Sequence, residues 1–171
     1  MGCLRRLTRL LDHLLRHQFL HGDLRRAVDR RTNKFGTPFL QPHLFRFRGS
    51  KRRMKYPAYR LSKENRVIVN HSIQETCHYR SWRLRASHVR SNHVHAVISA
   101  TGPPELVRDA LKSYASRDLN RARTEPLVQK RWTRHGSNLY LWTEESVQAA
   151  IRYVVDLQGT PMEVFEDLSE P

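Results

Sequence analysis

The chain of 171 residues is poor in cysteine and in acidic side chains, and it has no long apolar run. Its two cysteines, Cys3 and Cys77, form no CxxC pair and no disulfide framework, which is typical of a reducing compartment. No stretch approaches the roughly 20 apolar residues that a membrane span requires. Charged residues interrupt the leucine-rich N-terminus, so a signal peptide is not expected there. We therefore expect a cytoplasmic protein with no membrane contact.

Positive charge dominates what is present. The chain has 31 Lys and Arg against 16 Asp and Glu, which gives a formal net charge of +15. Most of the excess lies in residues 1–60, which hold 16 basic and 3 acidic side chains. Arginine, which accounts for 25 of the basic residues, matches phosphate oxygens and stacks on bases. Nucleic acid is therefore favoured as the partner over an anionic membrane, which such a charge could also bind, and over a merely soluble basic surface.

The apolar spacing predicts an α+β protein. Leucines at helical spacing predict a helix over residues 3–20, and Gly, Pro and Arg predict a long basic loop over 22–60. Further along, we expect a helix capped by Ser62, paired strands at 82–88 and 93–100, a helix from Pro104, a strand at 138–142 and a helix capped by Thr143. This order predicts a small antiparallel sheet with helices packed on one face, a ferredoxin-like or RRM-like sandwich.

The predicted organisation has three parts. Residues 1–60 form a basic N-terminal extension and loop with an atypical first element, residues 61–160 form the core, and residues 161–171 form an acidic tail. No basic residue follows Arg152.

The most informative motif is Asn92-His93-Val94-His95, at the start of a predicted buried strand. Side chains alternate along a strand, so His93 and His95 leave the same face and can bind one metal ion. A metal on a rigid strand can activate a phosphate or a water. The motif alone is a weak signal, since roughly half an HxH is expected by chance with 10 histidines. A metal hydrolase is one interpretation, disfavoured because no further His or carboxylate follows at ligand spacing on that strand.

Two helical tyrosines are candidates for a nucleophile. Tyr114 is in register with Val107 and Leu111, which indicates a core position. Tyr153 lies off the buried stripe of its helix, about 160° from Ile151 at 100° per residue, so its hydroxyl can face a groove. The alternative interpretation of Tyr153, an ordinary surface aromatic, is equally open at this point.

These segments together resemble the single-tyrosine HUH transposases of small insertion sequences and their REP-associated relatives. Asn92-His93-Val94-His95 resembles the HUH motif of that family. Residues 111–119 resemble its basic helix, residues 131–133 with 136–137 its Trp-centred loop, and residues 151–158 the helix that carries its tyrosine and a nearby amide ligand. The resemblance runs from about Leu61 to Gly159.

The resemblance implies that Tyr153 is the nucleophile and that His93, His95 and Gln158 bind a divalent cation, Mg²⁺ or Mn²⁺. It implies metal-dependent nicking and strand transfer of single-stranded DNA hairpins through a 5′-phosphotyrosine. The family usually acts as a homodimer in which one subunit's tyrosine completes the other's metal site. The expected DNA-binding residues are Lys112, Arg117, Arg131, Trp132 and Arg134, whereas Trp142 is expected to pack in the core.

Two features depart from the family pattern. The amide ligand commonly follows the tyrosine by four residues, but Leu157 stands there and Gln158 stands at five, which leaves Asp156 as a substitute ligand. The family also opens with a central apolar strand, where this chain has leucines at helical spacing. An alternative function is therefore a catalytically degraded or domesticated relative that only binds structured single-stranded nucleic acid.

Overall fold

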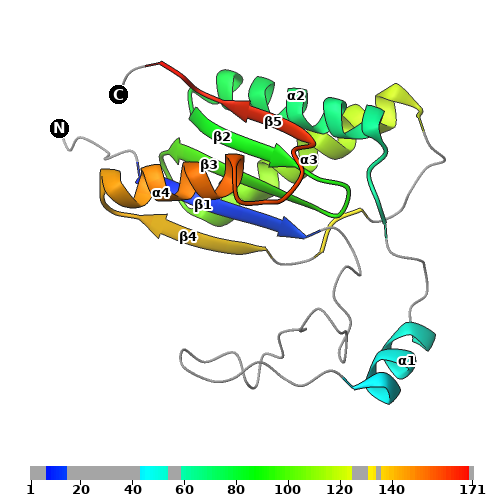
Figure 1. The fold of residues 1–171 in the computed structure, drawn as a ribbon. Helices are drawn as coiled ribbons and strands as arrows, with labels where there is room; N and C mark the ends of the chain where they lie inside the picture. Colours follow the sequence, from blue (N-terminus) through cyan, green and yellow to red (C-terminus); the bar gives the residue numbers. More distant parts are fainter. Residues whose placement is uncertain (1–6, 15–42, 54–58, 125–130, 134–135, 170–171) are drawn as a thin grey trace. The chain divides into compact units, whose positions relative to one another are not determined.

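The computed structural model describes residues 7–14, 43–53, 59–124, 131–133 and 136–169. The chain divides into two compact units, one made of residues 1–15 and 60–171 and the other of residues 16–59. In the second unit the described element is the short helix α1 (Leu44–Arg52), whose first turn is capped by His43. The candidate site lies in the first unit (Figure 1).

The first unit is built on a five-stranded antiparallel sheet with the order β4-β1-β3-β2-β5 (Figure 1). Its strands are β1 (Leu7–Leu14), β2 (Arg83–Val89), β3 (His93–Ala100), β4 (Ser137–Leu141) and β5 (Glu163–Glu166). The central strand β3 is buried along almost its whole length. Because side chains alternate, a buried central strand needs cover on both faces of the sheet.

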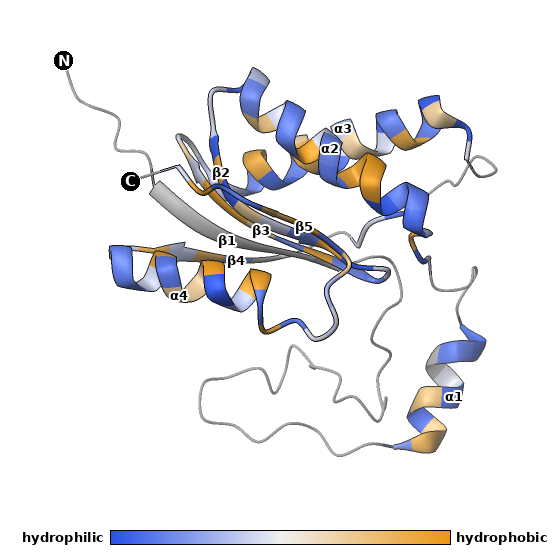
Figure 2. Ribbon diagram, turned by 45° about the horizontal axis from the view of Figure 1, so that its top comes forward, coloured by the Kyte–Doolittle hydropathy of each residue, from blue (hydrophilic) through white to orange (hydrophobic). Residues whose placement is uncertain are grey.

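Three helices supply that cover. The helices α2 (Lys63–Tyr79) and α3 (Pro104–Ala122) lie on one face, and α4 (Glu144–Val155) lies on the other (Figure 2). The core beneath α4 contains Ala86 of β2 and Val97 of β3, together with residues of β4 and α4: Leu141, Val147, Ala150, Ile151 and Val154. The next residue of β3, Ile98, is also fully buried and points to the opposite face.

The predicted α+β class with a small antiparallel sheet is confirmed. Ser62 accepts a hydrogen bond from the Asn65 N–H at 3.2 Å and so caps α2, and Thr143 forms a capping box at the start of α4. One part of the prediction is wrong, because the helices cover both faces of the sheet and not one. The physical reason is that β3 is apolar on both sides, with Val97 under α4 and Ile98 turned away from it.

The N-terminal helix expected over residues 3–20 is also wrong. Residues 7–14 form β1, which pairs with β3 on one side and β4 on the other. Leucine favours a helix only by tenths of a kcal/mol, and two long rows of backbone hydrogen bonds outweigh so weak a preference. The first element is therefore an inner strand of the sheet and not an atypical extension.

The C-terminal segment expected to be an acidic tail also joins the sheet. Residues 163–166 form β5, which pairs with β2 along its outer edge. Just beyond it, Asp167 forms an ion pair with Arg83 at 2.8 Å. Edge strands are commonly short and charged, so the acidic residues of this segment are compatible with its place as the edge strand β5.

A bulge in β2 changes which of its side chains face α4. The expected alternation put Leu84, Ala86 and His88 on one face, but the register shifts between Leu84 and Ala86. Leu84 is opposite Ile98, whereas Ala86 is opposite Val97, so the two lie on different faces. Downstream of the bulge, His88 therefore lies under α4.

Candidate active site

Three histidines lie on the face of the sheet that α4 covers. His93 and His95 come from β3, and His88 of β2 is the register partner of His95. The rings of His93 and His95 meet edge to face, with their centroids 4.7 Å apart. His88 is fully buried and His95 is 5% exposed. The strand alternation inferred from the sequence thus places the histidine pair side by side.

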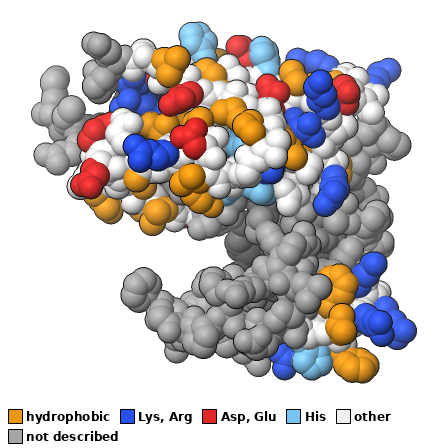
Figure 3. Space-filling view, viewed as in Figure 1, with side chains coloured by type: hydrophobic (Ala, Val, Ile, Leu, Met, Phe, Trp, Pro, Cys, Tyr) orange, Lys and Arg blue, Asp and Glu red, His pale blue; other side chains and the backbone are white. Residues whose placement is uncertain are grey.

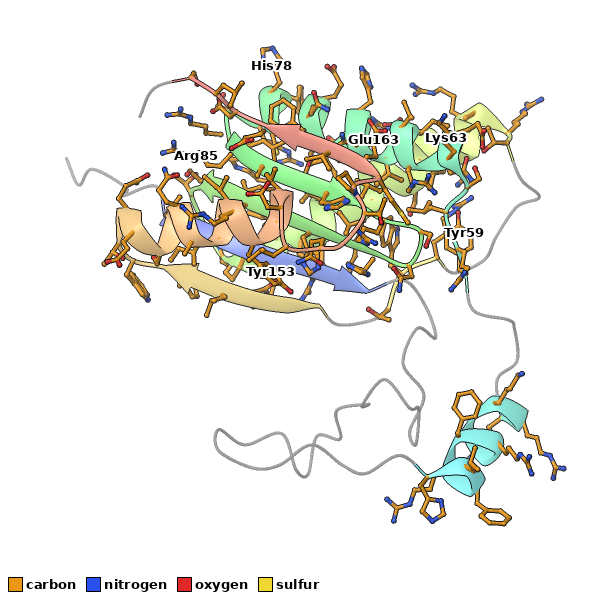
Figure 4. The ribbon with its side chains drawn as sticks, in the orientation of Figure 1. Tyr59, Lys63, His78, Arg85, Tyr153 and Glu163 are labelled. Carbon is orange, nitrogen blue, oxygen red and sulfur yellow. The ribbon has the colours of Figure 1, made fainter. Side chains whose placement is uncertain are left out.

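The helix α4 carries Tyr153 to this pair. Its buried stripe is the predicted one, and Tyr153 lies beside that stripe with 41% of its surface exposed. The phenol ring lies 5.6 Å from the His95 ring between centroids, at an interplanar angle of 77°. Tyr153, which comes from α4, is labelled in Figure 4. The tyrosine and the histidine pair therefore meet within one chain.

Gln158 reaches the same place because the helix ends before it. α4 stops at Val155, the N–H of Asp156 donates to the Arg152 carbonyl oxygen at 2.9 Å, and the chain then turns. The amide oxygen of Gln158 lies 3.4 Å from His93 Nε2, and its amide nitrogen donates to the Tyr153 carbonyl oxygen at 3.2 Å. Of the two ligand candidates left open by the sequence, Gln158 is the one beside the histidine pair, whereas Asp156 is exposed.

Burial favours the neutral form of His95 and of His88. Loss of solvent lowers the pKa of His95 from 6.5 to about 4, and the neighbouring His88 acts in the same direction, whereas a hydrogen bond with Gln158 opposes the shift. Burial also lowers the pKa of His88. A neutral imidazole is the form that binds a metal ion, so at neutral pH no proton has to be displaced from His95.

The donor set fits a divalent cation. Two donors about 2.1 Å from one octahedral cation, at right angles, lie about 3 Å apart. His93 Nε2 and the Gln158 amide oxygen, at 3.4 Å, are already close to that spacing. Within the described residues, no cluster of three His, Cys, Asp or Glu side chains has metal-binding geometry.

The expected DNA-binding residues near the Trp-centred loop are turned inward. Lys112 is buried, and its Nζ donates to the Thr133 carbonyl oxygen at 3.0 Å. Arg131 is buried as well and donates to Asn120 at 2.9 Å. The indole N–H of Trp132 donates to Ser116 Oγ at 2.9 Å. These hydrogen bonds hold residues 131–133 against α3.

The remaining expected DNA-binding residues differ in position. Arg117 is exposed, and its guanidinium lies 4.4 Å from the centroid of the Tyr114 ring. Both side chains line a cavity of about 340 Å³ between α2 and α3, on the opposite side of the sheet from Tyr153. Tyr114, expected in the core, is half-buried there. Arg134 lies outside the described residues.

The expectation that Trp142 packs in the core is wrong. It is 73% exposed and stacks on Tyr140, with ring centroids 5.4 Å apart and planes 19° from parallel. The reason is its position, since it follows the edge strand β4, where the chain leaves the sheet before α4.

Around α4 the surface is mixed in charge: acidic and basic side chains both lie on it in the view of Figure 3.

His88 is the residue of this site that the sequence analysis missed. A signal for it exists in the short turn between the two strands. The Arg90 N–H donates to the His93 carbonyl oxygen at 2.9 Å, and this tight closure places His88 opposite His95. A register counted outward from the turn predicts that pairing.

Comparison with known proteins gives a structural relationship. No protein-family model and no curated protein matches the sequence. Among solved structures, the chain is similar to one described as "Structure of the REP associates tyrosine transposase bound to a REP hairpin". The TM-score is 0.53 at 11% identity, over 91% of this chain and 68% of that chain. At this identity the similarity shows a shared fold. Separately, no helix in the described ranges is long and apolar enough to cross a membrane.

Proposed function

We propose that this protein nicks and rejoins single-stranded DNA folded into hairpins, through a covalent bond between Tyr153 and a 5′ phosphate. The observation that carries the proposal is the convergence of Tyr153, His93, His95 and Gln158 on one face of the sheet, from three segments of the chain. The fold shared with a transposase–hairpin complex supports it. A nucleophile beside two imidazoles suits phosphoryl transfer assisted by a metal.

The chemistry follows from the roles of these side chains. A bound Mg²⁺ or Mn²⁺ supplies a Lewis acid that draws charge from a non-bridging phosphate oxygen. His93, His95 and Gln158 would hold this cation, which would orient the scissile phosphate. Tyr153 loses its phenol proton to solvent, its oxygen bonds to phosphorus as the bond from phosphorus to the 3′ oxygen breaks, and that oxygen takes a proton from solvent and leaves as a hydroxyl. The phosphodiester energy is conserved in the tyrosine ester, so another 3′-hydroxyl can reverse the step without ATP.

DNA binding in this proposal draws on the charge of the whole chain. A net charge of +15 attracts a polyanion, and its phosphate contacts release counterions, so affinity falls steeply with added salt. A homodimer, which the family resemblance implies, is proposed for the strand-transfer step. It is not needed to complete the nucleophile and histidine arrangement, because Tyr153 lies beside His95 of its own chain.

The second candidate is a protein that binds structured single-stranded nucleic acid without cutting it. The charge favours binding whether or not the histidine pair acts, and this candidate is the expected outcome if the chain is a degraded or domesticated copy. The two candidates differ in one product, a covalent protein–DNA adduct.

The test is covalent trapping. The protein is mixed with a pool of single-stranded hairpin DNAs and Mn²⁺, and the products are separated on a denaturing gel. We expect a DNA-shifted band that is lost in Tyr153→Phe and on chelation, while DNA affinity stays within about 2-fold, because the lost hydroxyl is on an exposed ring and no charge changes. Tyr79→Phe, which removes a hydroxyl from an exposed tyrosine on α2, is the matched control and should keep the band.

Two results would count against the enzyme. A band that persists in Tyr153→Phe assigns the nucleophile to another side chain. No band with any hairpin, together with salt-sensitive binding, favours the protein that only binds.

A further inference from the structure

His88 makes two hydrogen bonds to the segment that runs from the end of α4 to the start of β5. Its Nδ1 lies 2.9 Å from the Val154 carbonyl oxygen, and its Nε2 lies 3.2 Å from the Met162 backbone nitrogen. A backbone N–H only donates, so Nε2 accepts from Met162, and Nδ1 carries the ring proton and donates to Val154. Both ring nitrogens are thus used within the protein, which leaves His88 no lone pair for a metal ion.

The two bonds go to two different parts of the candidate site. Val154 directly follows Tyr153 and belongs to the last turn of α4, where carbonyl groups lack partners inside the helix. Met162 ends the connection that carries Gln158 from α4 to β5. Thr160 lies on the same connection, and its carbonyl oxygen accepts a hydrogen bond from Arg90 Nη1 at 3.0 Å. One hydrogen bond from His88 therefore holds the end of α4, and two bonds, at Met162 and Thr160, hold the connection that follows.

We propose that His88 is a positioning residue that fixes Tyr153 through its bond to Val154 and Gln158 through its bond from Met162. The consequence for DNA cleavage rests on the proposed function, whereas the two hydrogen bonds can be tested without it. His88 is the register partner of His95 on the neighbouring strand, so whatever it holds is fixed relative to the histidine pair. A single buried ring thereby sets both the nucleophile and the third ligand.

Two amide substitutions separate the two bonds. In His88→Asn the short amide lies where Nδ1 was, so it can donate to Val154 but does not reach Met162. In His88→Gln the longer amide places its oxygen where Nε2 was, so it can accept from Met162 but does not serve Val154. Each variant keeps one tether and loses the other, which a general loss of packing would not do.

The expected results are opposite for the two variants. His88→Gln should slow adduct formation about 100-fold at saturating Mn²⁺, the cost of a nucleophile displaced by an ångström, while Mn²⁺ affinity is kept. His88→Asn should weaken Mn²⁺ binding, measured by calorimetry without DNA, about 10-fold or more, while the rate at saturating Mn²⁺ is kept. Hydrogen exchange at the Met162 amide should be faster in His88→Asn than in His88→Gln.

Ser87→Ala is the matched control. Ser87 is the neighbouring residue of β2, is fully buried, and donates to Asn70 Oδ1 at 2.7 Å on the opposite face of the sheet. If both His88 variants lose rate, Mn²⁺ affinity and Met162 protection only as Ser87→Ala does, the positioning role is overturned.

The proposal and the function beneath it can fail separately. A wild-type protein that forms no adduct refutes the proposed function, while Met162 exchange and Mn²⁺ affinity still decide whether His88 positions Gln158. If a His88 variant does not fold, hydrogen exchange at the Met162 amide of the wild type decides whether His88 holds the connection. Protection of the Met162 amide close to that of the core supports the tether, and exchange at the rate of an open loop overturns it.

Discussion

The stability of this protein should fall as the pH is lowered from 7 to 5, because His95 must give up a proton to fold. Burial lowers its folded pKa from 6.5 to about 4. Between these two values the unfolded chain binds a proton that the folded chain does not, so the free energy of unfolding rises with pH across this window. Well above pH 6.5 both states are neutral at this site, and its contribution is constant.

The size of the effect follows from the shift. One pKa unit corresponds to 1.36 kcal/mol, so the full shift of His95 represents about 3 kcal/mol, and about 2 kcal/mol of it is lost between pH 7 and pH 5. His88, whose pKa is also lowered by burial, acts with the same sign. About 2 kcal/mol is a large part of the stability of a domain of this size.

Urea unfolding at pH 7, 6 and 5, in the presence of a chelator, measures the effect. The comparison is with His95→Gln, because a chain with 10 histidines and a net charge of +15 also loses stability in acid for other reasons. The wild type should lose about 2 kcal/mol more than the variant between pH 7 and pH 5. Parallel losses in the two proteins would refute the reasoning that His95 is held neutral by burial.

Two further predictions test the elements around the site. Thr143→Ala removes the hydroxyl that accepts the Ser146 N–H in the capping box of α4, while the Thr143 N–H can still donate to Ser146 Oγ. It should cost about 1 kcal/mol in urea unfolding, whereas Thr143→Ser should cost much less; equal losses would show that the side-chain cap adds nothing. The thiol of Cys77 is buried in α2, and burial raises its pKa to about 12. In a Cys3→Ser background it should react with a thiol reagent only after unfolding, and rapid reaction in native buffer would contradict the packing of α2.

Much of the fold was predictable because its signals are local. Ser62 and Thr143 cap helices in the structure as their chemistry predicts, since a side-chain oxygen satisfies N–H groups within three residues. The buried stripe of α4 follows the 3.6-residue period, and the hairpin of β2 and β3 follows from a short turn. In each case the residues that decide the element lie within it or next to it.

The elements that were predicted wrongly depend instead on partners distant in the chain. The leucines of residues 7–14 fit a helix by spacing, yet these residues form a strand that pairs with β3 on one side and with β4 on the other. The bulge in β2 moves Ala86 and His88 to the α4 face, and β5 forms from an acidic segment because an edge of β2 is available. No local pattern contains that information, since the partner lies far away in the chain.

The candidate site divides in the same way. The sequence by itself determined that His93 and His95 share a face, since the period of a strand is fixed, and that Tyr153 lies off its helix's buried stripe. Only the tertiary structure decided that Gln158 and not Asp156 lies beside His93, across 65 residues of chain. It alone turned Lys112 inward and set His88 beneath the end of α4. Side-chain alternation is a property of the local backbone, whereas these contacts depend on where the sheet, the helix end and the following connection meet.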